Sequence, residues 1–176
     1  MQWIIAGLGN PVQEYDGTRH NVGRDMARAL EDTLTPKAKV VTPDVYMNNS
    51  GGPLRKLVAS KKAAEKLIVV HDDLDLPIGK VKLSFGSGSG GHRGVESVIK
   101  ALKTKDFIRI RIGISPATAS GKTKKPDPKR VVDFVLGKFR APELEKLKKI
   151  RKTVLEALTL LLEEGLERAM TEIHSR

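Results

Sequence analysis

Short apolar runs separated by amphipathic segments dominate the pattern of the chain. Continuous apolar residues at 3–7 and 67–71 predict strands that are covered on both faces, as in a sheet between two layers of helices. Alternating apolar and polar residues predict two further strands, at 79–85 and 107–114. A shorter strand is expected around Val40 and Val41, before the next helix begins.

Apolar side chains at helical spacing predict helices at 21–30, 53–58, 95–102 and 131–136, and a C-terminal helix over 141–170 that continues past Gly165. Serine, glycine, proline and lysine at 115–130 predict a mobile basic loop. Because strands alternate with helices in a chain of 176 residues, the class is α/β. We expect one domain over 1–176, an α/β/α sandwich with a twisted mixed sheet.

Composition narrows the range of partners. Lysine and arginine total 32 against 21 acidic residues, a net charge of +11, and this excess is typical of proteins that bind a polyanion such as nucleic acid. The absence of cysteine excludes disulfides, zinc–thiolate sites and cysteine nucleophiles. No apolar stretch is long enough to cross a membrane, and no signal-like segment opens the chain. We therefore expect a cytoplasmic protein without a membrane partner.

The chemistry-bearing side chains gather in loops and at predicted strand ends. Asn10 and His20 lie in the glycine-containing loop after the first strand, and Asp72 ends the strand at 67–71. Open α/β sheets build their sites at the carboxyl ends of neighbouring strands, so we expect these groups to meet. A histidine, a carboxylate that holds its tautomer, and the loop amides Asn10 and Asn48 suit the activation of water.

Three other kinds of site fit the sequence less well. A dinucleotide site is rejected, because Val12 stands where the third glycine of the fingerprint belongs. The glycine–serine run at 86–91 lacks the Gly-x-Ser-x-Gly spacing of a nucleophile elbow. A metal-dependent phosphoesterase using His71, Asp72 and Asp73 is a weak alternative, since a strand points successive side chains to opposite faces. His71 is better interpreted as a packing residue at the strand end.

Several short motifs occur together along the chain. In order they are Gly7-Leu8-Gly9-Asn10-Pro11, Tyr15, Gly17-Thr18-Arg19-His20-Asn21, Met47-Asn48-x-Ser50-Gly51, His71-Asp72-x-Leu74-Asp75, Gly90-Gly91-His92-x-Gly94, Arg109-x-Arg111-Ile112-Gly113-Ile114 and Val135-Leu136-Gly137. Each motif is weak alone, but the ordered set is specific. Together the motifs resemble bacterial-type peptidyl-tRNA hydrolase over nearly the whole chain.

The resemblance implies a monomeric enzyme without metal or cofactor that cleaves the ester between a peptide and tRNA. It assigns the base to His20, its supporting carboxylate to Asp72, and discrimination of peptidyl from aminoacyl esters to Asn10. Residues expected to contact the substrate are Tyr15, Tyr46, Asn48, His92 and Arg93, and those expected to bind a tRNA phosphate are Lys82 and Arg111.

Two features depart from the family pattern. Arg93 stands where an asparagine is usual, so one substrate contact is expected to differ. The segment between the first helix and Met47 is shorter than usual in the family, so we expect an edge hairpin to be missing. The alternative reading is a non-catalytic RNA-binding relative of the same fold, and Arg93 is its only support.

Overall fold

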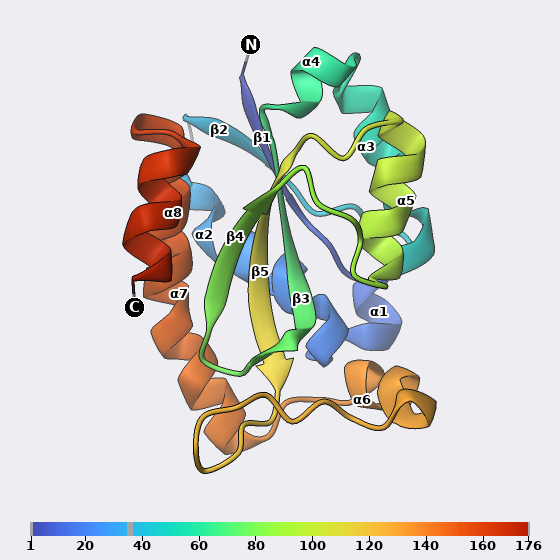
Figure 1. The fold of residues 1–176 in the computed structure, drawn as a ribbon. Helices are drawn as coiled ribbons and strands as arrows, with labels where there is room; N and C mark the ends of the chain where they lie inside the picture. Colours follow the sequence, from blue (N-terminus) through green and yellow to red (C-terminus); the bar gives the residue numbers. More distant parts are fainter. Residues whose placement is uncertain (1, 35–36, 176) are drawn as a thin grey trace.

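A five-stranded sheet runs through the middle of the molecule with helices on both of its faces (Figure 1). The computed structural model describes residues 2–34 and 37–175, and positions 1, 35, 36 and 176 lie outside them. The strands are β1 (Trp3–Gly7), β2 (Ala38–Val41), β3 (Leu67–Pro77), β4 (Val81–Phe85) and β5 (Ile108–Ser115). The helices are α1 (Val12–Tyr15), α2 (Val22–Leu34), α3 (Gly51–Leu57), α4 (Lys61–Ala64), α5 (Arg93–Leu102), α6 (Val131–Leu136), α7 (Ala141–Glu163) and α8 (Leu166–His174), with the 3₁₀ turns η1 (Arg19–Asn21), η2 (Met47–Asn49) and η3 (Pro128–Arg130).

The sheet is mixed, in the order β2-β1-β3-β5-β4, with β4 alone antiparallel to its neighbour. Between α2 and η2, the described residues form the single edge strand β2 and no hairpin. The α/β class and the mixed sheet predicted from the sequence are therefore confirmed. None of the described helices is both long enough and apolar enough to span a bilayer.

Apolar side chains fill two cores, one on each face of the sheet. On one face α2, α7 and α8 pack against residues such as Val70 and Ile110, and on the other α3 and α5 pack against Leu67 and Val69 (Figure 1). All four residues of 67–70 are fully buried, as their continuous apolar pattern predicted. In α3 the predicted apolar stripe is only partly right, because Leu57 is 38% exposed.

The predicted single C-terminal helix is wrong, because α7 ends at Glu163 and α8 begins at Leu166. Gly165 between them has φ +89°, a conformation that glycine adopts without strain, and its N–H donates to the carbonyl of Leu160 (3.0 Å), so the chain turns here at the end of α7. The turn lets α8 cover the edge strand β4, where the Leu83 N–H donates to His174 Nε2 (2.9 Å). The break therefore protects a sheet edge.

Close packing of α2 against β3 positions the loop that carries His20. A Cβ added at Gly23 would lie 2.2 Å from the carbonyl oxygen of Val70, so only glycine allows this approach. The turn η1 directly precedes α2, and His20 is thereby held beside Asp72 in the middle of β3. Gly94 does the same for the start of α5, where an added Cβ would meet Met47 Sδ at 2.4 Å.

Candidate active site

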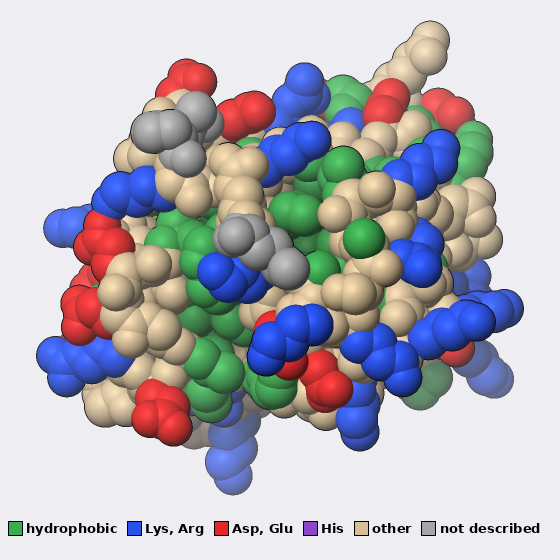
Figure 2. All heavy atoms as spheres, turned by 90° about the horizontal axis from the view of Figure 1, so that it is seen from above, with side chains coloured by type: hydrophobic (Ala, Val, Ile, Leu, Met, Phe, Trp, Pro, Cys, Tyr) green, Lys and Arg blue, Asp and Glu red, His purple; other side chains and the backbone are tan. Residues whose placement is uncertain are grey.

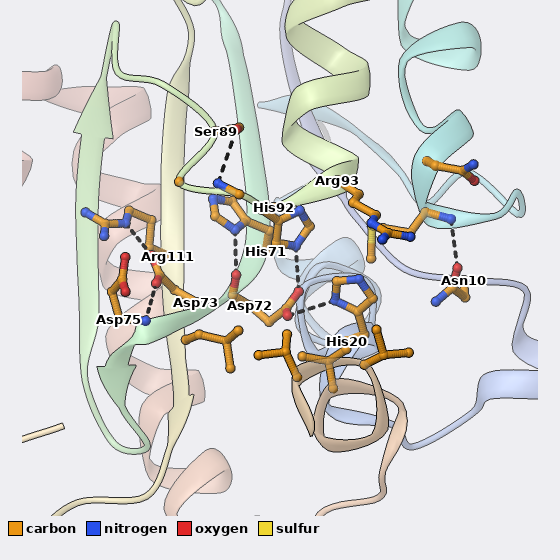
Figure 3. A pocket seen from close by; sticks show the side chains of 18 of the residues that line it. Asn10, His20, His71, Asp72, Asp73, Asp75, Ser89, His92, Arg93 and Arg111 are labelled. Carbon is orange, nitrogen blue, oxygen red and sulfur yellow. Dashed lines mark hydrogen bonds and ion pairs between the residues drawn. The ribbon is translucent and has the colours of Figure 1, made fainter. Parts of the chain in front are cut away.

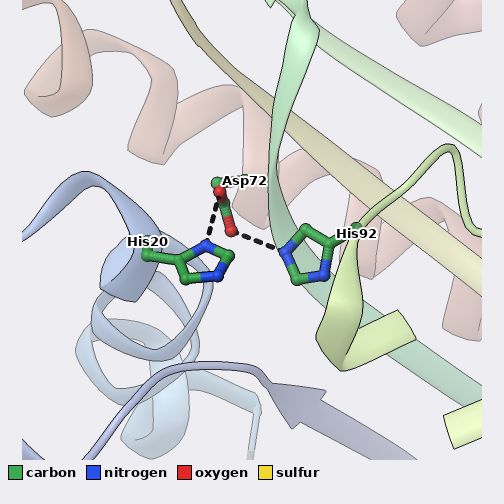
Figure 4. Close-up of side chains that lie close together, drawn as sticks. All are labelled: His20, Asp72 and His92. Carbon is green, nitrogen blue, oxygen red and sulfur yellow. Dashed lines mark hydrogen bonds and ion pairs between the residues drawn. The ribbon is translucent and has the colours of Figure 1, made fainter. Parts of the chain in front are cut away.

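His20, Asp72 and His92 form one hydrogen-bonded cluster beside β3, just past the point where its pairing with β1 ends (Figure 4). The prediction that Asp72 ends this strand is wrong, because β3 continues to Pro77 along its pairing with β5. His20 Nδ1 lies 2.8 Å from Asp72 Oδ2, and His92 Nε2 lies 2.8 Å from Asp72 Oδ1. The carboxylate is almost completely buried, with 2% of its side chain exposed. Each oxygen of Asp72 is thus engaged by a different histidine.

The protonation of His92 follows from its second role as the N-cap of α5. Its Nδ1 accepts hydrogen bonds from the backbone N–H groups of Gly94 and Val95, both at 3.2 Å. A nitrogen that accepts cannot also carry a proton, so the proton of His92 lies on Nε2 and is donated to Asp72. His92 is therefore a neutral brace for the carboxylate, and His20 remains as the base.

His20 has the opposite tautomer. Its Nδ1–H donates to Asp72, which leaves the Nε2 lone pair to act as a base toward the cavity. Burial alone would lower the pKa of His20, and the Arg93 charge also lowers it. The charge and hydrogen bond of Asp72 outweigh both, so the pKa is raised. Burial acts against ionisation of Asp72, yet the two histidines hold its pKa well below the ordinary range, so the carboxylate stays charged.

Hydrogen bonds within the protein engage every polar group of Asn10 except its side-chain nitrogen, Nδ2. Its Oδ1 accepts from the backbone N–H of Met47 (2.7 Å), which identifies that atom as the oxygen. The backbone N–H of Asn10 donates to Asn21 Oδ1 (2.8 Å). The backbone carbonyl of Asn10 accepts from Asn21 Nδ2 and from Arg24 Nη1, both at 3.0 Å. The loop is therefore rigid, and the Asn10 Nδ2 group is available to donate to a substrate.

A cavity of about 490 Å³ brings together nearly all of the residues predicted for the site (Figure 3). The aromatic rings of Tyr15 and Tyr46 meet edge to face at 6.3 Å, and the Tyr46 hydroxyl donates to Glu14 (2.9 Å). The predicted residues that line it are Asn10, Tyr15, His20, Tyr46, Asn48, Asp72, His92, Arg93 and Arg111.

Lys82, the other residue expected to bind a phosphate, does not line this cavity. The two residues are cross-strand neighbours of β4 and β5, so their side chains leave the same face of the sheet. Arg111 lines the cavity and its Nε donates to Asp73 Oδ2 (2.6 Å), whereas Lys82 lines an adjoining hollow beside His174. Lysine and arginine side chains also spread over the end of the molecule where α4 lies (Figure 2), so the positive charge extends beyond the cavity.

Arg93 projects into the cavity from the first position of α5. Figure 3 places it between the histidine cluster and Asn10. Within 2–34 and 37–175, no carboxylate forms a salt bridge with Arg93. A guanidinium without an internal partner is suited to an anionic or polar group of a ligand.

The metal alternative drawn from His71, Asp72 and Asp73 is not supported by the geometry. His71 is fully buried, its Nδ1 donates to the backbone carbonyl of Asp72 (2.7 Å), and its ring packs edge to face on His92 at 4.7 Å. The described group that could hold a metal ion is His20, Asp72 and His92, whose donor atoms lie within 4.8 Å. Because each Asp72 oxygen already accepts a hydrogen bond from one of the two histidines, this group is better described as a histidine–carboxylate cluster than as a metal site.

Two buried arginines support the site and were not singled out from the sequence. Arg24 fixes the Asn10 loop to the segment before η2 through the carbonyl of Thr42 (3.3 Å). Arg19, next to His20, donates to Glu143 Oε2 (3.1 Å) and to the carbonyl of Phe134 (3.2 Å). Their partners lie up to 124 residues away, so no local spacing signals them.

Comparison with known proteins agrees with this geometry. The family model described as peptidyl-tRNA hydrolase matches residues 4–176. The chain is 40% identical to the Mycobacterium marinum peptidyl-tRNA hydrolase, covering 98% of this chain and 97% of that protein. It is 38% identical to the chloroplastic enzyme of Arabidopsis thaliana, covering 100% of this chain and 66% of that protein. A crystal structure of the Acinetobacter baumannii peptidyl-tRNA hydrolase superposes with a TM-score of 0.81 at 29% identity, covering 98% and 94% of the two chains.

Proposed function

The chain belongs to the peptidyl-tRNA hydrolase family, and on that premise we propose that it cleaves the ester of peptidyl-tRNA with His20 as general base. The reaction returns tRNA from prematurely released peptide chains to use. One observation carries the assignment of the base: His20 alone in the cluster has a ring nitrogen that neither the Asp72 carboxylate nor a helix cap occupies.

The steps of ester hydrolysis follow from the free ring nitrogen of His20, Nε2. Nε2 of His20 takes a proton from water, and the water oxygen attacks the ester carbonyl. The Asp72 carboxylate stabilises the imidazolium through Nδ1–H. When the tetrahedral intermediate collapses, the bond to the ribose oxygen breaks and Nε2–H returns the proton to that oxygen. The products are a peptide with a free carboxylate and a tRNA with a free hydroxyl.

The amides and tyrosines position the substrate. We assign Asn10 Nδ2 to a carbonyl of the peptide, which an aminoacyl ester lacks, because Oδ1 is already held by Met47. Asn48 is exposed at the cavity rim and suits the same kind of contact. Tyr15 and Tyr46 stand together at the mouth, where their rings offer faces to the bases of the tRNA end.

The cations bind the tRNA in this proposal. Arg111 and Lys82 take a phosphate, since the two side chains share a sheet face beside the cavity. Arg93 takes a backbone phosphate or a ribose of the 3′ end, where its five donors replace the usual asparagine. Any step that needs an acceptor at that place uses Asn48 or a backbone carbonyl instead. His92 was expected to contact the substrate, but Asp72 and the N–H groups of α5 engage both of its ring nitrogens, so in this proposal it acts on the substrate through Asp72.

We propose a monomer that works in the cytoplasm and needs no cofactor for this chemistry. The test is release of labelled peptide from peptidyl-tRNA by the purified chain in the presence of chelator. Release at the same rate with and without chelator supports the histidine mechanism. Loss of release with chelator would favour a metal enzyme, and tRNA binding without release would favour the non-catalytic relative.

A further inference from the structure

One side of the catalytic cavity is apolar. It is formed by the end of β3 and by α6, and its lining side chains, here called the apolar wall, are Leu74, Val131, Val132, Val135 and Leu136. Val132 is 55% exposed, the most exposed of the large apolar residues in the described chain. In Figure 3 branched aliphatic side chains gather beside the α6 ribbon, next to His20 and Asp72. Exposed apolar surface inside a catalytic cavity indicates a binding role.

The cations of the cavity lie elsewhere. Arg93 enters from α5, and Arg109 and Arg111 come from β5. Figure 3 shows Arg93 and Arg111 on other sides of the histidine cluster from the aliphatic group. A polyanionic tRNA gains its binding free energy from cations and gains little from an aliphatic surface. With the ester at His20 and the tRNA on the cationic side, the acyl part of the substrate extends toward the apolar side.

We propose that the apolar wall binds the side chain of the amino acid that is esterified to the tRNA, and thereby favours apolar residues at that position. The proposal rests on the proposed function, because it concerns the same ester. The wall is one-sided and open to solvent at Val132, so we expect the preference for a leucine ester over a charged ester to lie at the low end of what an apolar pocket achieves, about tenfold.

The wall is fixed before substrate arrives. The Arg19 N–H donates to the carbonyl of Gly137 (2.9 Å), and its guanidinium lies 4.4 Å from the centroid of the Phe134 ring. The same guanidinium binds Glu143 at the start of α7. Because Arg19 adjoins His20, these contacts set the distance between the base and α6. A pre-organised surface costs less conformational entropy when it binds.

The experiment varies only the esterified amino acid. One tRNA is acylated with N-acetyl-leucine, N-acetyl-aspartate or N-acetyl-lysine, and kcat/KM is measured for each. The variants are Val132→Asp and Val132→Lys, which keep the exposed helical position folded. Leu144→Asp and Leu144→Lys are matched controls, because Leu144 is 47% exposed but lies outside the cavity. Ratios between substrates cancel any general effect of the new charge on tRNA binding.

The wild type should prefer the leucine ester to both charged esters by about tenfold or more. Val132→Asp should shift the lysine-to-aspartate ratio upward, and Val132→Lys should shift it downward, each by about threefold or more, while the Leu144 pair leaves it unchanged. An unchanged lysine-to-aspartate ratio of kcat/KM in both Val132 variants overturns the proposal. Equal losses of rate with all three esters would indicate that Val132 contacts the tRNA, and no loss would indicate that it contacts neither part of the substrate. A wild type that hydrolyses none of the esters instead refutes the proposed function itself.

Discussion

Replacing Asp72 with asparagine tests how the cluster fixes the proton on His20. The carboxylate offers an acceptor to each histidine, whereas the amide offers one oxygen and one NH₂ group. His92 must remain a donor at Nε2, because its Nδ1 is held by the N–H groups of α5. The amide oxygen therefore turns to His92, and the NH₂ group faces His20.

The consequence is the wrong tautomer of His20. Its Nδ1 must then accept from the amide, so its proton moves to Nε2, the nitrogen that should receive a proton from water. The same exchange in Ser–His–Asp triads lowers turnover about 10⁴-fold. We expect kcat for Asp72→Asn to fall by about 10³–10⁴ in single-turnover peptide release, with KM changed by less than about threefold, because no tRNA contact is touched.

A second substitution distinguishes a wrong tautomer of His20 from the simple loss of the Asp72 charge. In Asp72→Asn/His92→Ser the serine still caps α5, but the Nε2–H donor is gone. The amide can then turn its oxygen to His20, and we expect about tenfold or more of the lost kcat to return. His92→Ser alone serves as the control and should cost less than Asp72→Asn. Failure of the double variant to recover any activity would refute the tautomer argument.

Three further outcomes are expected. Binding of tRNA should weaken steeply with salt, and the Lys82→Ala/Arg111→Ala variant should reduce that log–log slope by about 1–2 in a filter-binding titration; an unchanged slope would place the phosphate contacts elsewhere. Arg93→Ala should raise KM more than it lowers kcat, and Arg93→Asn should retain activity; if Arg93→Ala changes neither constant, Arg93 is a bystander. Burial lowers the pKa of His71 far below 6.5, so the folded state keeps it neutral while the unfolded state takes up a proton below that pH. The free energy of unfolding should therefore fall as pH drops below about 6.5, by up to about 1.4 kcal/mol per unit, and His71→Asn should lose that part of the slope in urea titrations; equal slopes would contradict it.

Local pattern was sufficient for the elements that position the base. The continuous apolar run at 67–71 and the loop after β1 predicted that Asp72 and His20 would meet, and the structure joins the two side chains, although β3 continues past Asp72 to Pro77. The alternation within β4 and β5 shows which side chains share a face of each strand, and the register between the strands places Lys82 opposite Arg111. Both patterns depend on residues a few positions apart.

Features set by distant packing were not predictable. Nothing in the spacing of Gly-Gly-His-x-Gly shows that His92 both caps α5 and donates to Asp72, since the second bond depends on how the loop before α5 crosses β3. The apolar stripe continues on both sides of Gly165, and a glycine within a helix costs only about 1 kcal/mol. The turn at Gly165 brings α8 onto the edge of β4, which is far away in sequence and would otherwise be uncovered.

Single-turnover release of peptide from peptidyl-tRNA by wild type and His20→Ala, both in excess chelator, tests the central claim most directly. A positioned base contributes about 10²–10⁴-fold, so His20→Ala should be slower by that factor, with tRNA affinity preserved. Wild-type release that persists in chelator and collapses in His20→Ala is the predicted result. Release by His20→Ala at the wild-type rate would contradict the assignment of His20 as the base.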